Sequence, residues 1–225
     1  MTCPQCKGQT RNQAVGSTCP TCDVWFPGDV LCLWPASKIL SKEIGIVMND
    51  TRTRTARVKI GRHTPQVYWF LSKAFEHETE GKALLDFGCG YGQGREPLEA
   101  AGWEWHGTDL LQRVEHPRFI PLEELCCHRE SFHVVALSNV VNVQTNKNQL
   151  FSLISSAAHV LRDNGWLVWN LPGTPRYMPE YSLSDTRLLV REALHKYGYE
   201  VLAQEHRLSL TCYQIKRIER DGHGR

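Results

Sequence analysis

Short apolar runs alternate with amphipathic stretches along the second half of the chain. The runs have the length and continuity of buried strands, and the longer stretches place apolar residues at helical spacing. The predicted strands are residues 83–87, 104–108, 118–122, 132–137, 165–170, 199–206 and 208–218. The predicted helices are residues 66–75, 95–101, 148–161 and 185–197. Strands that alternate with helices form βαβ units, so the sequence predicts an α/β fold, a Rossmann-like sheet with helices on both faces.

Two helix boundaries also have sequence signals. Asn164 and Gly165 follow the helical stretch at residues 148–161 and are typical of a helix C-terminus. Ser184 directly precedes the stretch at residues 185–197, and a serine there predicts an N-cap. We therefore expect the first helix to end before Asn164 and the second to begin after Ser184.

A glycine-rich turn follows the first of these strands. Asp86 lies at its end, and Gly88, Gly90 and Gly92 come next, just before a helical stretch. Glycines allow the backbone to turn tightly and to approach a ligand closely. The N–H groups at the start of the following helix add to such a site. Because ligands of open α/β sheets bind at the carboxyl ends of the strands, this turn predicts a nucleotide-like cofactor there.

The spacing of the glycines distinguishes between cofactors. A dinucleotide fold requires G-x-G-x-x-G, whereas Gly88, Gly90 and Gly92 form G-x-G-x-G. The carboxylate of Asp86 would repel a pyrophosphate but suits the cationic amino-acid end of a ligand. Asp109 ends the next apolar stretch and can accept hydrogen bonds from both hydroxyls of a ribose. A strand–turn–helix that binds another nucleotide, or nothing, is the alternative.

The D-x-G-x-G-x-G turn and the acid at the next strand end resemble the class I S-adenosylmethionine-dependent methyltransferases. The resemblance covers residues 82–218 and implies S-adenosylmethionine as the methyl donor. The positions that it implies for donor binding are Asp86, Gly88, Cys89, Gly90, Tyr91, Gly92, Asp109, Leu110, Ser138 and Asn139.

Two asparagines follow the strand at residues 132–137. Asn139 and Asn142 are the candidate catalytic residues, because they reach the same sheet edge as the glycine turn. A local role in capping the turn is the alternative for each of them. Methyl transfer needs a general base only where the acceptor carries a proton at the point of attack. His133 lies inside the strand and is expected to be structural.

Four of the nine cysteines have the spacing of a metal site. Cys3, Cys6, Cys19 and Cys22 form C-x₂-C-x₁₂-C-x₂-C, which supplies four thiolates to a tetrahedral zinc ion. A segment this short needs a cross-link such as a bound metal ion in order to fold. We therefore predict a structural zinc ribbon, with a redox role for the pairs as the alternative.

The predicted domains are residues 1–30, the ribbon; 31–80, a basic linker and helical extension; 81–218, the methyltransferase domain; and 219–225, a loose tail.

Composition limits the possible locations and partners. The net charge is +2 and charged residues make up 22% of the chain, an ordinary balance for a soluble protein. Nucleic-acid binding would therefore require a local cluster of charge. No apolar run approaches a membrane span, and the first residues lack a signal region. We expect a cytoplasmic protein with reduced cysteines and no membrane partner.

Such a cluster of charge lies ahead of the predicted sheet. Between Asp50 and Glu76 there is no acidic residue, and the candidate substrate contacts are Arg52, Arg54, Arg57, Lys59 and Arg62. Cations can neutralise phosphates, and Tyr68, Trp69 and Trp34 can stack on an unpaired base. Arg176 and Tyr177, in the loop after residue 170, are further candidates. The alternative is a solvated basic linker whose aromatic residues face the core.

Two narrower resemblances point to nucleic acid. The segment Arg54–Arg62, the glycine turn and the run from Ser138 to Val143 are similar to methyltransferases associated with DNA phosphorothioate modification and to phage-type proteins. The four-cysteine module ahead of the turn resembles, in architecture, the guanine methyltransferases of large-subunit ribosomal RNA, although their fourth ligand is histidine and here it is Cys22.

Three functions remain open at this point. A nucleic-acid methyltransferase, of DNA or RNA, is the first. A small-molecule or protein methyltransferase, with a ribbon that binds a protein partner, is the second. A donor-binding regulatory protein without turnover is the third. The sequence does not identify the methylated atom.

Overall fold

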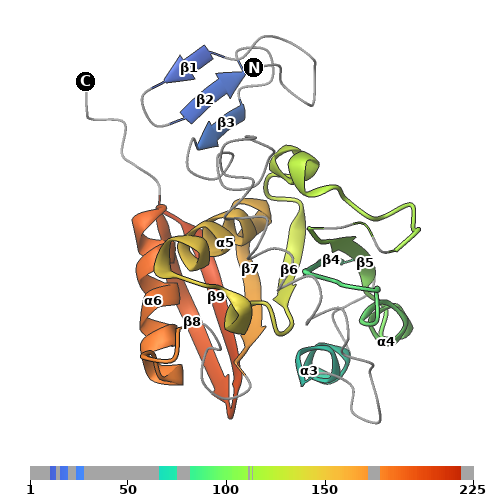
Figure 1. The fold of residues 1–225 in the computed structure, drawn as a ribbon. Coiled ribbons are helices and arrows are strands. Elements are labelled where there is room, and N and C mark those ends of the chain that lie inside the picture. Colours follow the sequence, from blue (N-terminus) through green and yellow to red (C-terminus); the bar gives the residue numbers. More distant parts are fainter. Residues whose placement is uncertain are drawn as a thin grey trace.

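The computed structural model describes residues 11–13, 16–19, 24–27, 66–74, 82–110, 112, 114–171 and 178–218. Its main body is one six-stranded sheet with helices (Figure 1). The strands are β4 (Ala83–Phe87), β5 (Glu104–Thr108), β6 (Phe132–Leu137), β7 (Leu161–Asn170), β8 (Tyr199–Arg207) and β9 (Leu210–Arg217). The helices are α3 (Gln66–Ala74), α4 (Arg95–Ala100), α5 (Lys147–Val160) and α6 (Leu183–Lys196), with 3₁₀ helices η1 (Leu122–Cys127) and η2 (Val141–Val143).

The strand order places four parallel strand ends at one edge. The order is β5-β4-β6-β7-β9-β8, in which β5, β4, β6 and β7 run parallel and β9 pairs antiparallel with β7. β8 pairs antiparallel with β9 and is the last strand on that side. The carboxyl ends of the parallel strands therefore meet at one edge, where ligands of such sheets bind.

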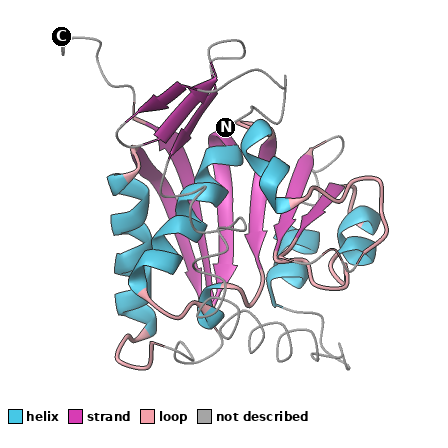
Figure 2. Ribbon diagram, turned by 45° about the horizontal axis from the view of Figure 1, so that its top comes forward, coloured by secondary structure: helices cyan, strands magenta, loops and turns pink. Residues whose placement is uncertain are grey.

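Helices cover both faces of the sheet, as the sequence predicted. In β4, Leu85 and Phe87 face a core built with α5 and α6, and Leu84 faces a second core built with α3 and α4. Figure 2 shows helices lying over the strands. Because neighbouring residues of a strand point to opposite faces, Asp86 lies on the same side as Leu84, toward α3 and α4. The fold class predicted from the sequence, a Rossmann-like α/β sheet, is confirmed in this part of the chain.

A small separate sheet lies in the segment predicted to be the ribbon. β1 (Arg11–Gln13), β2 (Gly16–Cys19) and β3 (Val24–Pro27) pair antiparallel in the order β1-β2-β3. Of the four cysteines, only Cys19 falls within these strands, and only its backbone is described. Cys3, Cys6 and Cys22 lie outside the described residues, so the zinc site stays a prediction.

The prediction of a strand at residues 118–122 is wrong. Only one bridge, between Gly107 and Phe119, links this segment to the sheet. Pro117 and Pro121 flank the bridge and lack the N–H groups that a ladder needs, so pairing stops there.

Two predicted boundaries are also wrong. The predicted strand at residues 165–170 begins earlier, because β7 starts at Leu161, and its pairing with β6 is shifted between Phe132 and Val134. Asn164 accordingly has a positive φ of 62° inside the strand. The N-cap of α6 is Ser182 and not Ser184, because Ser182 accepts from the backbone N–H of Asp185 and the Asp185 side chain accepts from the Ser182 N–H.

Candidate functional site

The glycine turn after β4 has an unusual backbone. Gly88, Gly90 and Gly92 have φ values of 85°, 57° and 70°, which side chains other than glycine rarely adopt. The turn is tied to the end of β5, because the N–H groups of Gly88 and Cys89 both donate to the carbonyl of Thr108, at 2.8 and 3.1 Å. The sequence-predicted turn therefore exists, and its glycines are required by its conformation.

The three glycines differ in what a side chain would meet. A Cβ at Gly88 would lie 2.5 Å from Val140, and one at Gly92 would lie 3.0 Å from Val114. A Cβ at Gly90 would meet no atom within 4 Å. Gly88 and Gly92 are thus packed against the protein, whereas Gly90 faces open space. A ligand can approach the backbone most closely at Gly90.

Asp109 lies directly beside this open position. Its Oδ2 accepts a hydrogen bond of 2.8 Å from the Gly90 N–H, so the turn after β4 and the end of β5 are joined. Its Oδ1 makes no hydrogen bond within the described part of the chain, and Leu110, the next residue, is half-buried. Gly90 and Asp109, two of the residues that the sequence predicted for donor binding, are therefore brought together, and Asp109 Oδ1 has no partner among the described residues.

Asp86 occupies a different environment from the one expected. It is fully buried, and both carboxylate oxygens accept from the Tyr68 hydroxyl of α3, at 2.9 and 3.0 Å. The Trp105 indole N–H donates to Oδ2 at 3.4 Å. Burial raises the pKa of Asp86 to about 7, although both hydrogen bonds oppose that rise. In this structure the carboxylate is thus bound within the protein, and its predicted contact with a donor remains a prediction.

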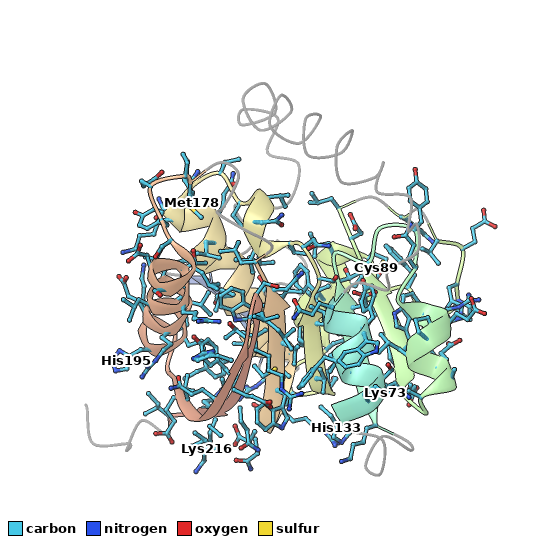
Figure 3. All side chains as sticks on the ribbon, turned by 90° about the horizontal axis from the view of Figure 1, so that it is seen from below. Lys73, Cys89, His133, Met178, His195 and Lys216 are labelled. Carbon is cyan, nitrogen blue, oxygen red and sulfur yellow. The ribbon has the colours of Figure 1, made fainter. Side chains whose placement is uncertain are left out.

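Gly94 makes room for this arrangement at the start of α4. A Cβ there would lie 2.6 Å from the Tyr68 ring and 2.9 Å from Asp86 Oδ2. Cys89 is buried in the same core, and a Cβ at Gly107 would lie 3.0 Å from its sulfur. Figure 3 labels Cys89 at the turn and Lys73 in the last turn of α3. Tyr91, in contrast, is 55% exposed.

The end of β6 carries the candidate catalytic residues. Asn139 has a left-handed φ of 59°, and its backbone N–H donates to Asn170 Oδ1 at 2.7 Å. In return, Asn170 Nδ2 donates to Asn139 Oδ1 at 2.9 Å. This pair links the ends of β6 and β7. Asn139 is thus held at the edge of the sheet by a buried partner that the sequence analysis did not single out.

Several buried polar atoms at this edge have no partner in the described part of the chain. They belong to Thr108 at the end of β5, Ser138 after β6 and Asn142 in η2. Ser138 lies beside Tyr68 and lowers the phenol's pKa, but its hydroxyl makes no hydrogen bond of normal geometry with any described residue. Buried polar groups are normally paired. Polar atoms without a partner in the described ranges, after β5 and after β6, therefore suit a polar ligand.

His133, which the sequence analysis expects to be structural, lies away from the candidate site. His133 lies near the start of β6, at the opposite edge from the glycine turn. Its Nδ1 accepts from the Ala83 N–H at 3.2 Å, and its Nε2 lies 2.6 Å from a guanidinium nitrogen of Arg162. Burial, and then the charge of Arg162, lowers the pKa of His133.

Other predicted contacts lie outside the described residues or are placed differently. Those outside are Cys3, Cys6, Cys22, Arg52, Arg54, Arg57, Lys59, Arg62, Arg176 and Tyr177. The prediction that Tyr68 stacks on an unpaired base is wrong, because Tyr68 is buried against Asp86. Trp69 is 55% exposed, so its predicted role is still possible.

Sequence reasoning missed Asn170 and the contact of Tyr68 with Asp86. The contacts of Tyr68 with Asp86 and of Asn170 with Asn139 join residues 18 and 31 positions apart. For Asn170 there was a signal, since it ends a predicted strand at the same edge as Asn139. For Tyr68 there was none.

Among the described residues, no three His, Cys, Asp or Glu side chains come together as a metal site would require. No helix in the described ranges is long and apolar enough to cross a membrane.

No protein-family model and no curated protein matches the sequence. Solved structures match the fold. One, from work on the conversion of a disulfide bond into a thioacetal group during echinomycin biosynthesis, is 14% identical, with 79% of this chain and 94% of that chain covered and a TM-score of 0.50.

Two further structures have lower TM-scores. A TehB-like SAM-dependent methyltransferase from Corynebacterium glutamicum is 16% identical, with 78% of this chain and 100% of that chain covered and a TM-score of 0.49. The 1,6-didemethyltoxoflavin-N1-methyltransferase from Burkholderia thailandensis is 13% identical, with 94% of this chain and 100% of that chain covered and a TM-score of 0.48. At such identities the likeness concerns the fold alone.

Proposed function

We propose that this protein is an S-adenosylmethionine-dependent methyltransferase that modifies a nucleic acid. The observation that carries the proposal is the pairing of Gly90 with Asp109. Gly90 offers a backbone without a side chain toward open space, and beside it Asp109 has one carboxylate oxygen without a hydrogen-bond partner among the described residues. A ribose and its attached chain need such a combination of a close backbone approach and a carboxylate acceptor.

The residues at the sheet edge fit this donor. Asp109 Oδ1 would accept from the ribose hydroxyls, while Oδ2 stays bound to Gly90 and keeps the carboxylate in place. Half-buried Leu110 would cover an apolar ring beside it. The donor brings an activated methyl group on a sulfonium, so the protein's contribution is mainly positioning.

The acceptor side would use the residues after β6. Asn170 fixes Asn139 in its left-handed conformation, and Asn142 has a buried carbonyl oxygen without a partner in the described ranges. Such amides can orient an acceptor amine or ring nitrogen by hydrogen bonds. In this proposal Asn139 and Asn142 hold the acceptor in line with the donor.

A nucleic-acid acceptor is supported by the sequence ahead of the sheet. The basic run from Arg52 to Arg62 has no acidic neighbour between Asp50 and Glu76, and a four-cysteine motif predicted to bind zinc precedes it. Cations in this number can neutralise phosphates, and the exposed Trp69 can stack on a base. A small-molecule or protein acceptor, or donor binding without turnover, would be the alternatives.

The first test measures donor binding. Calorimetric titration of the zinc-replete protein with S-adenosylmethionine is expected to show one site, and Asp109→Ala is expected to abolish it without unfolding the protein. Asp163→Ala is the control, because its carboxylate accepts from the Arg217 N–H elsewhere in the sheet. Equal donor affinity in wild type and Asp109→Ala would contradict the assigned ribose contact.

The second test identifies the acceptor. The protein is incubated with methyl-labelled S-adenosylmethionine and, separately, DNA, total RNA or a protein extract. Label in one nucleic-acid pool would support the proposal. Label in protein alone, or donor binding without any label, would favour an alternative.

A further inference from the structure

Two arginines and a histidine lie together where α6 meets β8. Arg187 and Arg191 are four residues apart on α6, so they share one face of the helix. His206 comes from β8, the last strand of the sheet, and its ring packs edge-on against the Tyr213 ring, with centroids 6.0 Å apart. We call Arg187, Arg191 and His206 the α6–β8 basic surface.

The charge of this surface is not neutralised within the described part of the chain. Neither Arg187 nor Arg191 forms an ion pair there. The neighbouring acids are engaged elsewhere, since Glu192 binds Lys147 at 2.8 Å and Glu205 binds Arg207. After burial, the charges of Arg187 and Arg191 are what lower the pKa of His206. Like charges held together without a partner favour the binding of an anion.

Arg187 is held in a fixed orientation. Its Nε donates to the Thr211 hydroxyl at 3.0 Å, and its Nη2 donates to the Leu208 carbonyl at 3.1 Å. Thr211 is fully buried, so this anchor is part of the sheet. A guanidinium that is already ordered loses less conformational entropy when it binds a ligand. Arg191 is exposed one turn further along α6.

The basic surface is connected to the proposed acceptor edge by three short links. Leu208, whose carbonyl binds Arg187, precedes Ser209, and the Ser209 carbonyl accepts from the Leu171 N–H at 3.0 Å. Asn170, beside Leu171, holds Asn139. Leu208 itself is 89% exposed at this turn, with a left-handed φ of 52°. The α6–β8 basic surface and Asn139 are therefore linked through the β8–β9 turn, which carries an exposed apolar side chain.

We infer that the α6–β8 basic surface binds the phosphate backbone of the nucleic acid whose base is methylated. The inference rests on the proposed function but uses none of the residues between Arg52 and Arg62. Guanidinium groups bind phosphate oxygens in a bidentate manner, and the exposed Leu208 offers contact to a base or sugar. An acidic protein segment could also bind the two arginines, but the link between this surface and Asn139 gives no reason for such a ligand.

The test is the binding of fluorescein-labelled single-stranded DNA and RNA oligonucleotides of mixed sequence, followed by anisotropy at several salt concentrations. Arg191→Gln and the double variant Arg187→Gln/Arg191→Gln are compared with wild type. Arg191 makes no hydrogen bond in the described ranges, so its replacement leaves the fold intact. Arg129→Gln is the control, because Arg129 is similarly exposed but pairs with Glu130 near the start of β6.

Arg191→Gln is expected to weaken binding roughly threefold to tenfold and to reduce the slope of log K against log salt by about 1. The double variant is expected to lose about twice that slope, and the control to change neither quantity. Unchanged binding in both variants, or an equal loss in the control, would overturn the inference. Stronger binding of a poly-glutamate peptide than of either oligonucleotide would assign the surface to a protein.

Donor titrations on the same variants separate the two proposals. If the arginine variants bind oligonucleotides as well as wild type does and S-adenosylmethionine still binds, only the inference about the α6–β8 basic surface is overturned. If donor binding fails in wild type, the proposed function fails, whatever the oligonucleotides show.

Discussion

The Tyr68 hydroxyl donates to the carboxylate of Asp86, with its oxygen 2.9 and 3.0 Å from the two carboxylate oxygens. Both side chains are buried, and they come from α3 and from the end of β4. Burial, and then the charge of Asp86, raises the pKa of Tyr68 well above its usual value, so the phenol remains a donor. A helix that precedes the sheet is thereby bonded to the strand that leads into the glycine turn.

Tyr68→Phe is expected to destabilise the protein by about 1–3 kcal/mol, because a buried carboxylate loses its main partner. Since the hydrogen bond from Tyr68 lowers the pKa of Asp86, its loss raises that pKa further and the ionised form becomes more costly. Urea unfolding should therefore show a larger loss at pH 8.5 than at pH 5.5. Tyr181→Phe is the control, since the Tyr181 hydroxyl makes no hydrogen bond in the described ranges; an equal effect there would contradict the assignment.

Asp86 itself should make stability depend on pH. Its pKa is raised from 3.8 to about 7, so between these values the folded state holds a proton that the unfolded state releases. The contribution of Asp86 to stability is fully present below about pH 4 and is lost as the pH rises through 7, by up to about 4 kcal/mol in all. Asp86→Asn does not titrate and should remove this decline. Free energies of unfolding in urea from pH 4.5 to 8.5 test this, and parallel curves for wild type and variant would show that Asp86 is not the group.

Gly90 and Gly198 allow a matched comparison. Both have positive φ values, 57° and 83°, and in neither case would a Cβ meet an atom within 4 Å. Alanine at either position should cost about 1–2 kcal/mol of backbone strain. Only Gly90→Ala would place a methyl group beside Asp109, so it should weaken S-adenosylmethionine binding by about tenfold or more, whereas Gly198→Ala should not. Calorimetry measures both, and equal affinities would place the donor elsewhere.

Ser182→Ala should destabilise the protein by about 0.5–2 kcal/mol, because it removes the N-cap of α6. Ser184→Ala, two residues along and exposed, should change stability by less than about 0.5 kcal/mol. Thermal unfolding of the two variants under one set of conditions measures the difference. A larger loss of stability in Ser184→Ala than in Ser182→Ala would show that Ser184 is the N-cap, as the sequence predicted.

The sequence predicted elements whose signals are local. The apolar run at Ala83–Phe87, the glycines after it and the stripe of α5 are each readable within a few residues. The N-cap of α6 was readable too, since Ser182 and Asp185 have the spacing of a capping box, but Ser184 stood closer to the helical pattern. Local patterns thus predicted the fold and the edge of the sheet where the candidate site lies.

Contacts between distant residues could not be predicted in this way. Nothing near Tyr68 indicates that its hydroxyl binds Asp86, because that depends on how α3 packs on the sheet. The start of β7 at Leu161 depends likewise on pairing with Phe132. The fixed Asn139 conformation requires Asn170 from the neighbouring strand. Each of these features arises from the assembled sheet.

The position of α3 also affects how the protein can be divided for experiments. A fragment that starts immediately before β4 would lack Val67, Tyr68 and Leu71, all of which are buried. It would expose the apolar residues that they cover, among them Trp103, whose indole N–H donates to the Leu71 carbonyl at 3.1 Å, and would leave Asp86 without its phenol. Such a fragment is expected to aggregate. A fragment intended for purification should therefore start ahead of Gln66, so that it includes α3.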